Sequence, residues 1–189
     1  MMVKENIANY IFHTTFSSDI TNITDKIFNA DVVWDKHTWS DNYGNLDTQK
    51  SDDDVLVSTP DNDEQEKLQA ALGKYVYEYP LYIGLDQVGV TTMDGVRFNK
   101  YPSGSYMDYH VDNIRSVCHG CGSRETGVPI LSAVGLLNDD FTGGEFLLCG
   151  KKIELKKNSL LVFPSNFMYP HTVTKIREGA RYSFVTWMW

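Results

Sequence analysis

The sequence predicts a mainly β fold with flanking helices (α+β): a jelly roll buttressed by N-terminal helices. Two segments with helical periodicity come first, and after Gly95 the pattern changes to short apolar runs separated by Gly, Asn, Asp and Pro residues. Eight such runs suit two packed sheets. No repeat, linker or second domain is visible. Residues 1–189 are therefore expected to form one domain, with helical and strand support over 1–95 and a jelly-roll core over 96–189.

The composition is that of a globular protein. Hydrophobic residues make up 42% and aromatic residues 13% of the 189 residues, which excludes a disordered tail. A net charge of -8 argues against non-specific binding to nucleic acid phosphates. Three cysteines, an odd number, indicate a reducing compartment. The N-terminus has no apolar run or cleavage site, so a soluble, cytoplasmic protein without membrane contact is expected.

Both helical segments precede the strands. The first is expected from Ser18 to Asn29, after a serine that can cap it, with its apolar face formed by Ile20, Ile23, Ile27 and Phe28. A strand is expected from Asp31 to Trp39. The second helix should begin near Asp61 and be interrupted at Pro80, with its core stripe formed by Leu68, Ala71, Leu72, Tyr75, Val76 and Tyr79.

A polar, acidic stretch over 40–54 lies between these elements. Such a charge run is typical of a solvated loop, because it cannot bury enough apolar surface to pack. The alternative is a mobile lid over a catalytic cleft.

The expected strands of the second half are the runs VRFNKY, SYMDYHVD, ILSAVGLL, GEFLL, KKIEL, SLLVF, HTVTKI and RYSFVTWMW.

Candidate metal ligands stand out in this second half. His110 and Asp112 are two residues apart, and on a strand such residues point to the same side of the sheet. This pattern alone occurs often by chance. His171, which follows a proline and opens a strand, can complete a 2-His-1-carboxylate set of the kind that binds non-haem Fe(II).

Arg181 strengthens this interpretation. In the last strand Arg181, Ser183, Val185 and Trp187 share one face. An arginine on the inner face of a barrel needs an anion, since a buried unpaired charge costs several kcal/mol. A guanidinium can grip a carboxylate through two parallel hydrogen bonds. Together the metal set and the clamp suggest an oxygenase that consumes a keto acid.

The second half resembles the Fe(II)/2-oxoglutarate-dependent dioxygenases, and among them the prolyl 4-hydroxylase-like branch. The resemblance runs from about Val96 to Trp189 and is carried by YPSGSYMDYHVD, LLNDDFTGGEFLL, SLLVFPS, YPHTV and RYSFVTWMW. The fold that it implies is a double-stranded β-helix, a jelly roll with the metal at its mouth.

The resemblance also implies roles for individual residues. His110, Asp112 and His171 match the iron ligands, which would make them the catalytic residues, and Arg181 matches the residue that binds the distal carboxylate of 2-oxoglutarate. Further matches are Ser183 and Tyr101 at the co-substrate and Trp187 near the metal. Arg97 and Asn99 share a strand face with Tyr101, which makes them candidates for the substrate pocket.

The implied reaction hydroxylates a prolyl residue in a protein or peptide, releases succinate and CO2, and uses ascorbate as a reductant. A nucleic acid base is disfavoured, because the demethylase branch has a second arginine where this chain has Trp187. Halogenases lack the carboxylate ligand, whereas Asp112 is present. A free amino acid, another side chain, or a non-catalytic metal-binding or ligand-binding module remain the alternatives.

A second possible metal site is the pair Cys118 and Cys121, with His119 between them. No second pair with suitable spacing follows, so a loop near the active-site mouth is favoured over a zinc site.

Overall fold

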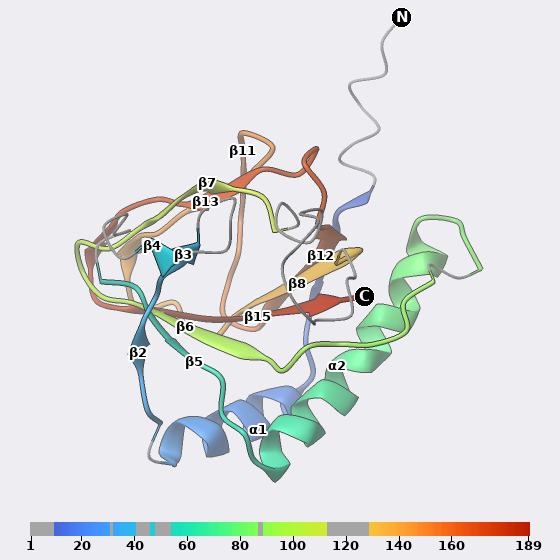
Figure 1. Ribbon diagram of the computed structural model, residues 1–189, viewed down its shortest axis with the longest axis horizontal. Helices are drawn as coiled ribbons and strands as arrows, with labels where there is room; N and C mark the ends of the chain where they lie inside the picture. The colour runs from blue at the N-terminus through green and yellow to red at the C-terminus, as the bar shows by residue number, and fades with distance from the viewer. Residues whose placement is uncertain (1–9, 31, 41–45, 48–53, 87–88, 113–128) are drawn as a thin grey trace, which may run out of the picture.

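The computed structural model describes residues 10–30, 32–40, 46–47, 54–86, 89–112 and 129–189. Two antiparallel sheets dominate it (Figure 1). The larger one has the order β1 (Phe12–Thr15), β12 (Ser159–Pro164), β8 (Leu131–Leu136), β15 (Arg181–Met188), β6 (Arg97–Tyr101), β5 (Leu56–Ser58) and β2 (Asp35–Lys36).

The smaller sheet has the order β11 (Lys151–Ile153), β10 (Phe146–Leu148), β13 (His171–Val173) and β7 (Met107–His110). Two short pairs complete the strands, namely β14 (Ile176–Glu178) with β9 (Thr142–Gly143), and β3 (Trp39–Ser40) with β4 (Leu46–Asp47). The two main sheets form the double-stranded β-helix that the sequence predicted.

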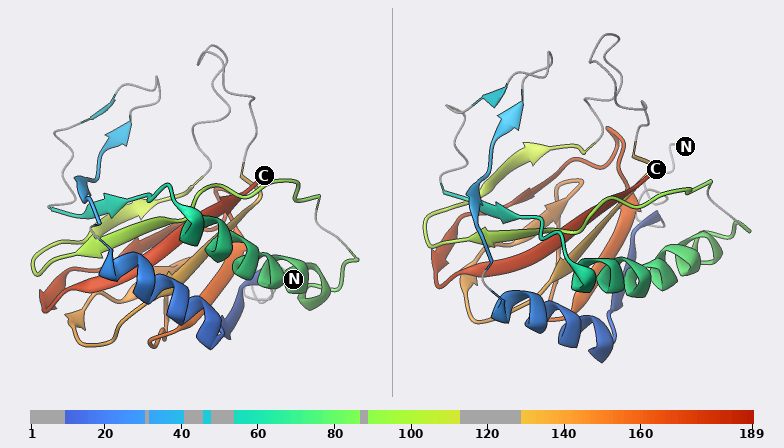
Figure 2. Two further views of the ribbon diagram at one scale, coloured as in Figure 1. Left: turned by 90° about the horizontal axis from the view of Figure 1, so that it is seen from below. Right: turned by 60° about the horizontal axis from the view of Figure 1, so that its bottom comes forward.

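Both faces of the large sheet are buried, and alternation along its strands explains how. In β12, Leu160 and Val162 pack towards the helices, whereas Leu161 and Phe163 pack towards the small sheet. All six residues of β8 are buried. Figure 2 shows the two helices lying along one side of the large sheet, with the smaller sheet on the other. The cavity between the sheets is thus lined by alternate residues of β6, β13 and β15, with further side chains from β7, β8 and β10.

Helix α1 (Ser18–Asn29) has the bounds that the sequence predicted. It buries Ile20 and Ile27 against the large sheet. The expected serine cap is absent, because the hydroxyl of the N-cap residue Ser17 makes no capping hydrogen bond. Instead, the Ser17 amide donates to the Tyr75 hydroxyl at 2.9 Å, which ties the start of α1 to the second helix.

Helix α2 (Asp63–Tyr82) begins close to the predicted start, with the Asn62 side chain accepting from the Gln65 amide at 3.1 Å. The predicted interruption at Pro80 is wrong, because the helix continues to Tyr82. A proline in the last turn removes only one amide donor, and the Ile83 amide still donates to the carbonyls of Tyr79 and Pro80. The ring of Pro80 is buried.

The first strands also differ from expectation. The single strand expected over Asp31–Trp39 is replaced by the two-residue strands β2 and β3. Strand β1, which was not expected, pairs with β12 at the edge of the large sheet. Its four residues FHTT are too few to show a reliable two-residue period.

Candidate metal centre and keto-acid pocket

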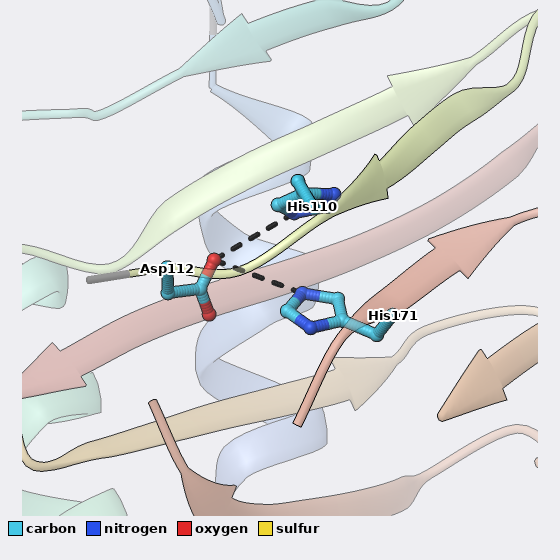
Figure 3. Close-up of side chains that lie close together, drawn as sticks. All are labelled: His110, Asp112 and His171. Carbon is cyan, nitrogen blue, oxygen red and sulfur yellow. Dashed lines mark ion pairs between the residues drawn. The ribbon is translucent and has the colours of Figure 1, made fainter. Parts of the chain in front are cut away.

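Three side chains from the small sheet and the turn after it converge on one point (Figure 3). Asp112 Oδ1 lies 3.6 Å from His110 Nε2 and 3.7 Å from His171 Nε2. All three ligand atoms lie within 4.8 Å of one another. His110 and His171 are directly opposite each other in the pairing of β7 with β13. Strand β7 ends at His110, so Asp112 stands in the following turn and not on the strand as expected.

The imidazoles are oriented by backbone carbonyls. His110 Nδ1 lies 2.8 Å from the carbonyl oxygen of Asp108, and His171 Nδ1 lies 3.1 Å from that of Tyr169. A carbonyl only accepts, so each Nδ1 carries the proton and each Nε2 presents a lone pair. Two lone pairs and a carboxylate oxygen thus face one another. This donor set repels itself without a cation and fits a divalent metal ion.

The protonation states suit this arrangement. Burial, the neighbouring His171 and Arg97 together lower the pKa of His110 to about 4, so the ring is neutral at pH 7. Burial alone would raise the pKa of Asp112, but the two imidazoles and the Ser132 hydroxyl hold it below its ordinary value. The ligand atoms of His110 and Asp112 are therefore free of competing protons near neutral pH.

Two serines hold the Asp112 carboxylate in place. Ser132 Oγ on β8 donates to Asp112 Oδ2 at 2.5 Å, and the Ser165 hydroxyl lies 2.8 Å from Ser132 Oγ. Because Ser132 spends its only proton on Asp112, Ser165 must be the donor in the second bond. Sequence reasoning missed both serines. Ser132 lies in a completely buried strand and reads as a small core residue.

A buried cation lies deeper between the sheets. Arg181 is 1% exposed, and its guanidinium is 5.2 Å from the centre of the Tyr101 ring. Its Nη1 donates to Ser183 Oγ at 2.8 Å, while Nη2 is buried without a hydrogen-bond partner. Burial lowers the pKa of Arg181, but guanidinium stays charged. Within the described part of the chain no carboxylate pairs with Arg181, so it is suited to an anionic ligand.

The remaining candidates line the same cavity as the triad and Arg181. Asn99 and Tyr101 on β6 lie opposite Ser183 and Arg181 on β15. Arg97, next on the same face of β6, has its guanidinium 4.8 Å from the centre of the Trp187 ring. The structure therefore places all nine sequence-predicted site residues around one cavity: His110, Asp112, His171, Arg181, Tyr101, Ser183, Trp187, Arg97 and Asn99.

Comparison with known proteins agrees with this geometry. The model of the 2OG-Fe(II) oxygenase superfamily matches residues 96–189, the stretch that contains the triad and Arg181. The chain belongs to this superfamily. Among its curated relatives, the PKHD-type hydroxylase PiuC of Pseudomonas aeruginosa is 30% identical over 96 residues, and a PKHD-type hydroxylase of Nitrobacter winogradskyi is 31% identical over 97 residues. Both matches cover 48% of this chain and 41% of the relative.

Solved structures share the fold of this chain over nearly its whole length. A prolyl-4-hydroxylase of Pseudomonas putida has a TM-score of 0.63 at 19% identity, covering 97% of this chain and 95% of its own. A prolyl hydroxylase of Trichoplax adhaerens, in complex with a peptide fragment of hypoxia inducible factor, has a TM-score of 0.68 at 18% identity and covers 100% and 87%. Fe(II) and 2-oxoglutarate, the groups that name the superfamily, fit the donor set and the buried cation.

Two expectations concern residues outside the described part of the chain. They are the choice between loop and zinc site at Cys118 and Cys121, and most of the acidic stretch over 40–54. Among the described residues, no helix combines the length and apolar character needed to cross a bilayer.

Proposed function

We propose that residues 1–189 form one oxygenase domain that hydroxylates an unactivated C–H bond, with a prolyl residue in a protein or peptide as the substrate. The observation that carries this proposal is the pairing of a two-histidine, one-carboxylate cluster with a buried, unpaired arginine in the same cavity. A structural metal would need no such arginine. The prolyl hydroxylase fold of the neighbours supports the substrate class.

In the proposed site, His110, Asp112 and His171 would hold Fe(II). Arg181, with Ser183 and Tyr101, takes the distal carboxylate of 2-oxoglutarate. When bound, iron and the keto acid use O2 to supply the oxidant, releasing succinate and CO2 as the substrate gains a hydroxyl group.

The contribution of this chain is orientation and exclusion of water. Carbonyls of Asp108 and Tyr169 fix the two imidazoles, and Ser132 fixes the carboxylate. Apolar side chains from both sheets, including Val134, Phe146 and Val185, line the cavity and keep it dry. The ligands are thus held ready before the metal arrives.

The test is an assay with Fe(II), 2-oxoglutarate and ascorbate that measures succinate and, by mass spectrometry, a gain of one oxygen on prolyl peptides. Asp112→Ala should abolish both signals. Asp139→Ala, the same change at an exposed turn residue, should alter neither. Iron-dependent succinate without an oxygen on proline would redirect the substrate to a free amino acid or another side chain. No succinate from the wild type would indicate a non-catalytic metal-binding module.

A further inference from the structure

A second arginine stands at the open end of the cavity. Exposure increases from Arg181 (1%) and Tyr101 (3%), which are buried, to Arg97 and Trp187, which are partly exposed. The cavity therefore opens at the end where Arg97 lies. The Arg97 guanidinium stacks on Trp187, which is the residue of the inner face of β15 farthest from Arg181. The Arg97 guanidinium therefore lies at the end of the cavity away from Arg181.

Arg97 lies too far from Arg181 for one keto acid to occupy both. The Arg181 guanidinium bonds Ser183, whereas the Arg97 guanidinium stacks on Trp187, which lies four residues, or about 13 Å, further along the same extended strand. The two carboxyl carbons of 2-oxoglutarate are only roughly 5 Å apart, given C–C bonds of about 1.5 Å. A keto acid gripped by Arg181 therefore ends before the Arg97 guanidinium.

Among the described residues, no carboxylate forms an ion pair with Arg97, and its Nε is buried without a hydrogen-bond partner. Asp112, the described carboxylate whose charge acts on Arg97, is committed to the triad. With ferrous iron, neutral histidines, Asp112, dianionic 2-oxoglutarate and two guanidiniums, the loaded cavity would keep one positive charge in excess. One further anion would balance it.

We propose that Arg97 is a specificity-determining residue that binds a carboxylate of the substrate, so that the preferred substrate carries a carboxylate close to the carbon that is hydroxylated. The proposal rests on the proposed oxygenase function and narrows it. The carboxylate can be the free α-carboxylate of a C-terminal or free residue, or the side chain of an acidic neighbour. The Trp187 ring holds the Arg97 guanidinium against its face, at the end of the cavity away from Arg181.

The test measures binding by calorimetry without oxygen, to protein loaded with Fe(II) and 2-oxoglutarate. The probes are N-acetyl-proline, N-acetyl-prolinamide, and two amidated dipeptides in which N-acetyl-proline precedes aspartate or alanine. Wild-type protein should bind one anionic probe about 10- to 100-fold more tightly than its neutral counterpart. Preference for N-acetyl-proline would assign the α-carboxylate, and preference for the aspartyl dipeptide would assign a side chain.

Substitutions then locate the preference. Arg97→Gln should reduce the ratio of anionic to neutral binding to about one, and Arg97→Lys should keep part of it. Lys100→Gln removes a cation from the same strand, where the side chain lies near the rings of Trp34 and Tyr182, and should leave the ratio unchanged.

Three results would overturn the proposal. The first is equal or undetectable binding of anionic and neutral probes by the wild type. The second is a preference for anionic probes that survives in Arg97→Gln. The third is an Arg97→Gln variant that loses affinity for 2-oxoglutarate alone. Hydroxylation of an internal prolyl peptide without acidic residues, at the rate of its acidic counterpart, would refute the role of Arg97 while leaving the oxygenase function intact.

Discussion

At the scale of single residues, the metal-binding triad of His110, Asp112 and His171 is held by hydrogen bonds that the spacing of these residues in the sequence does not reveal. Each histidine is oriented by the carbonyl two residues before it, and the carboxylate by a serine from the other sheet. The ligand atoms therefore keep their positions without a metal, because a hydrogen bond on the other side of each side chain fixes its orientation. Removing such a support should weaken the site without removing any ligand.

The serine pair offers a direct test of this support. Ser132→Ala should lower Fe(II) affinity about 10-fold, because Asp112 loses the hydroxyl that orients it. Ser165→Ala should cause a smaller loss, since the Ser165 hydroxyl bonds Ser132 and the bond from Ser132 to Asp112 remains. Anaerobic titration of the metal-free protein with Fe(II) measures both. Equal losses of Fe(II) affinity in the two variants would contradict the order of the hydrogen bonds, in which Ser165 donates to Ser132 and Ser132 to Asp112.

The buried arginine should be sensitive even to a conservative change. Arg181→Lys should raise the KM for 2-oxoglutarate about 10- to 100-fold, because lysine cannot form two parallel hydrogen bonds to one carboxylate. Iron affinity should change much less. Arg177→Lys, the same substitution at an exposed ion pair with Glu145, should leave the KM unchanged. A parallel fall in iron affinity and keto-acid affinity would argue against a clamp at Arg181.

At the scale of elements, the large sheet is a layer buried on both faces, and β8 lies within it. Its Gly135 stands directly opposite Phe184 on β15. A Cβ at Gly135 would lie 2.2 Å from two carbons of the Phe184 ring, and that ring is fully buried. The aromatic ring thus occupies the space that a side chain at Gly135 would need.

Gly135→Ala should therefore lower the free energy of unfolding by about 1–3 kcal/mol, because the Phe184 ring must move within a packed core. Gly73→Ala makes the same substitution inside α2, where nothing lies within 4 Å of the new methyl group, and should raise stability by about 0.5–1 kcal/mol. Urea denaturation measures both changes. Similar changes in stability at the two sites would show that the Phe184 ring moves aside at little energetic cost.

The elements also show which features the sequence can specify. Alternation along the last strand predicted which of its side chains share the cavity. The spacing of His110 and Asp112 indicated the metal cluster although Asp112 lies in a turn, and Tyr101 was predicted only through the resemblance to the dioxygenases. Ser132 could not be predicted, because on a strand buried on both faces a serine has no distinguishing period. The sequence placed the end of α2 at Pro80 because proline disfavours a helix interior, but a proline in the last turn removes only one amide donor.

At the scale of the whole molecule, the cavity joins the two sheets. His110 and His171 belong to the small sheet, whereas Arg181 belongs to the large one. A diacid bound between the metal and the guanidinium would connect the two sheets through ligands that neither sheet provides alone. Metal and keto acid should therefore stabilise the fold together more than the sum of their separate effects.

Mn(II), which does not turn over, tests this coupling. Mn(II) and 2-oxoglutarate, each at 100 times its Kd for the free protein, should together stabilise the fold by more than about 5.4 kcal/mol, which is twice the roughly 2.7 kcal/mol expected from one such ligand and amounts to a Tm increase of about 10 °C or more. Either ligand alone at that concentration should stabilise the fold by about 2.7 kcal/mol. In Asp112→Ala, where Arg181 is intact, the joint shift should fall to that of the keto acid alone. Shifts that merely add in the wild type, or a full joint shift in Asp112→Ala, would mean that the diacid does not bridge the sheets through the metal.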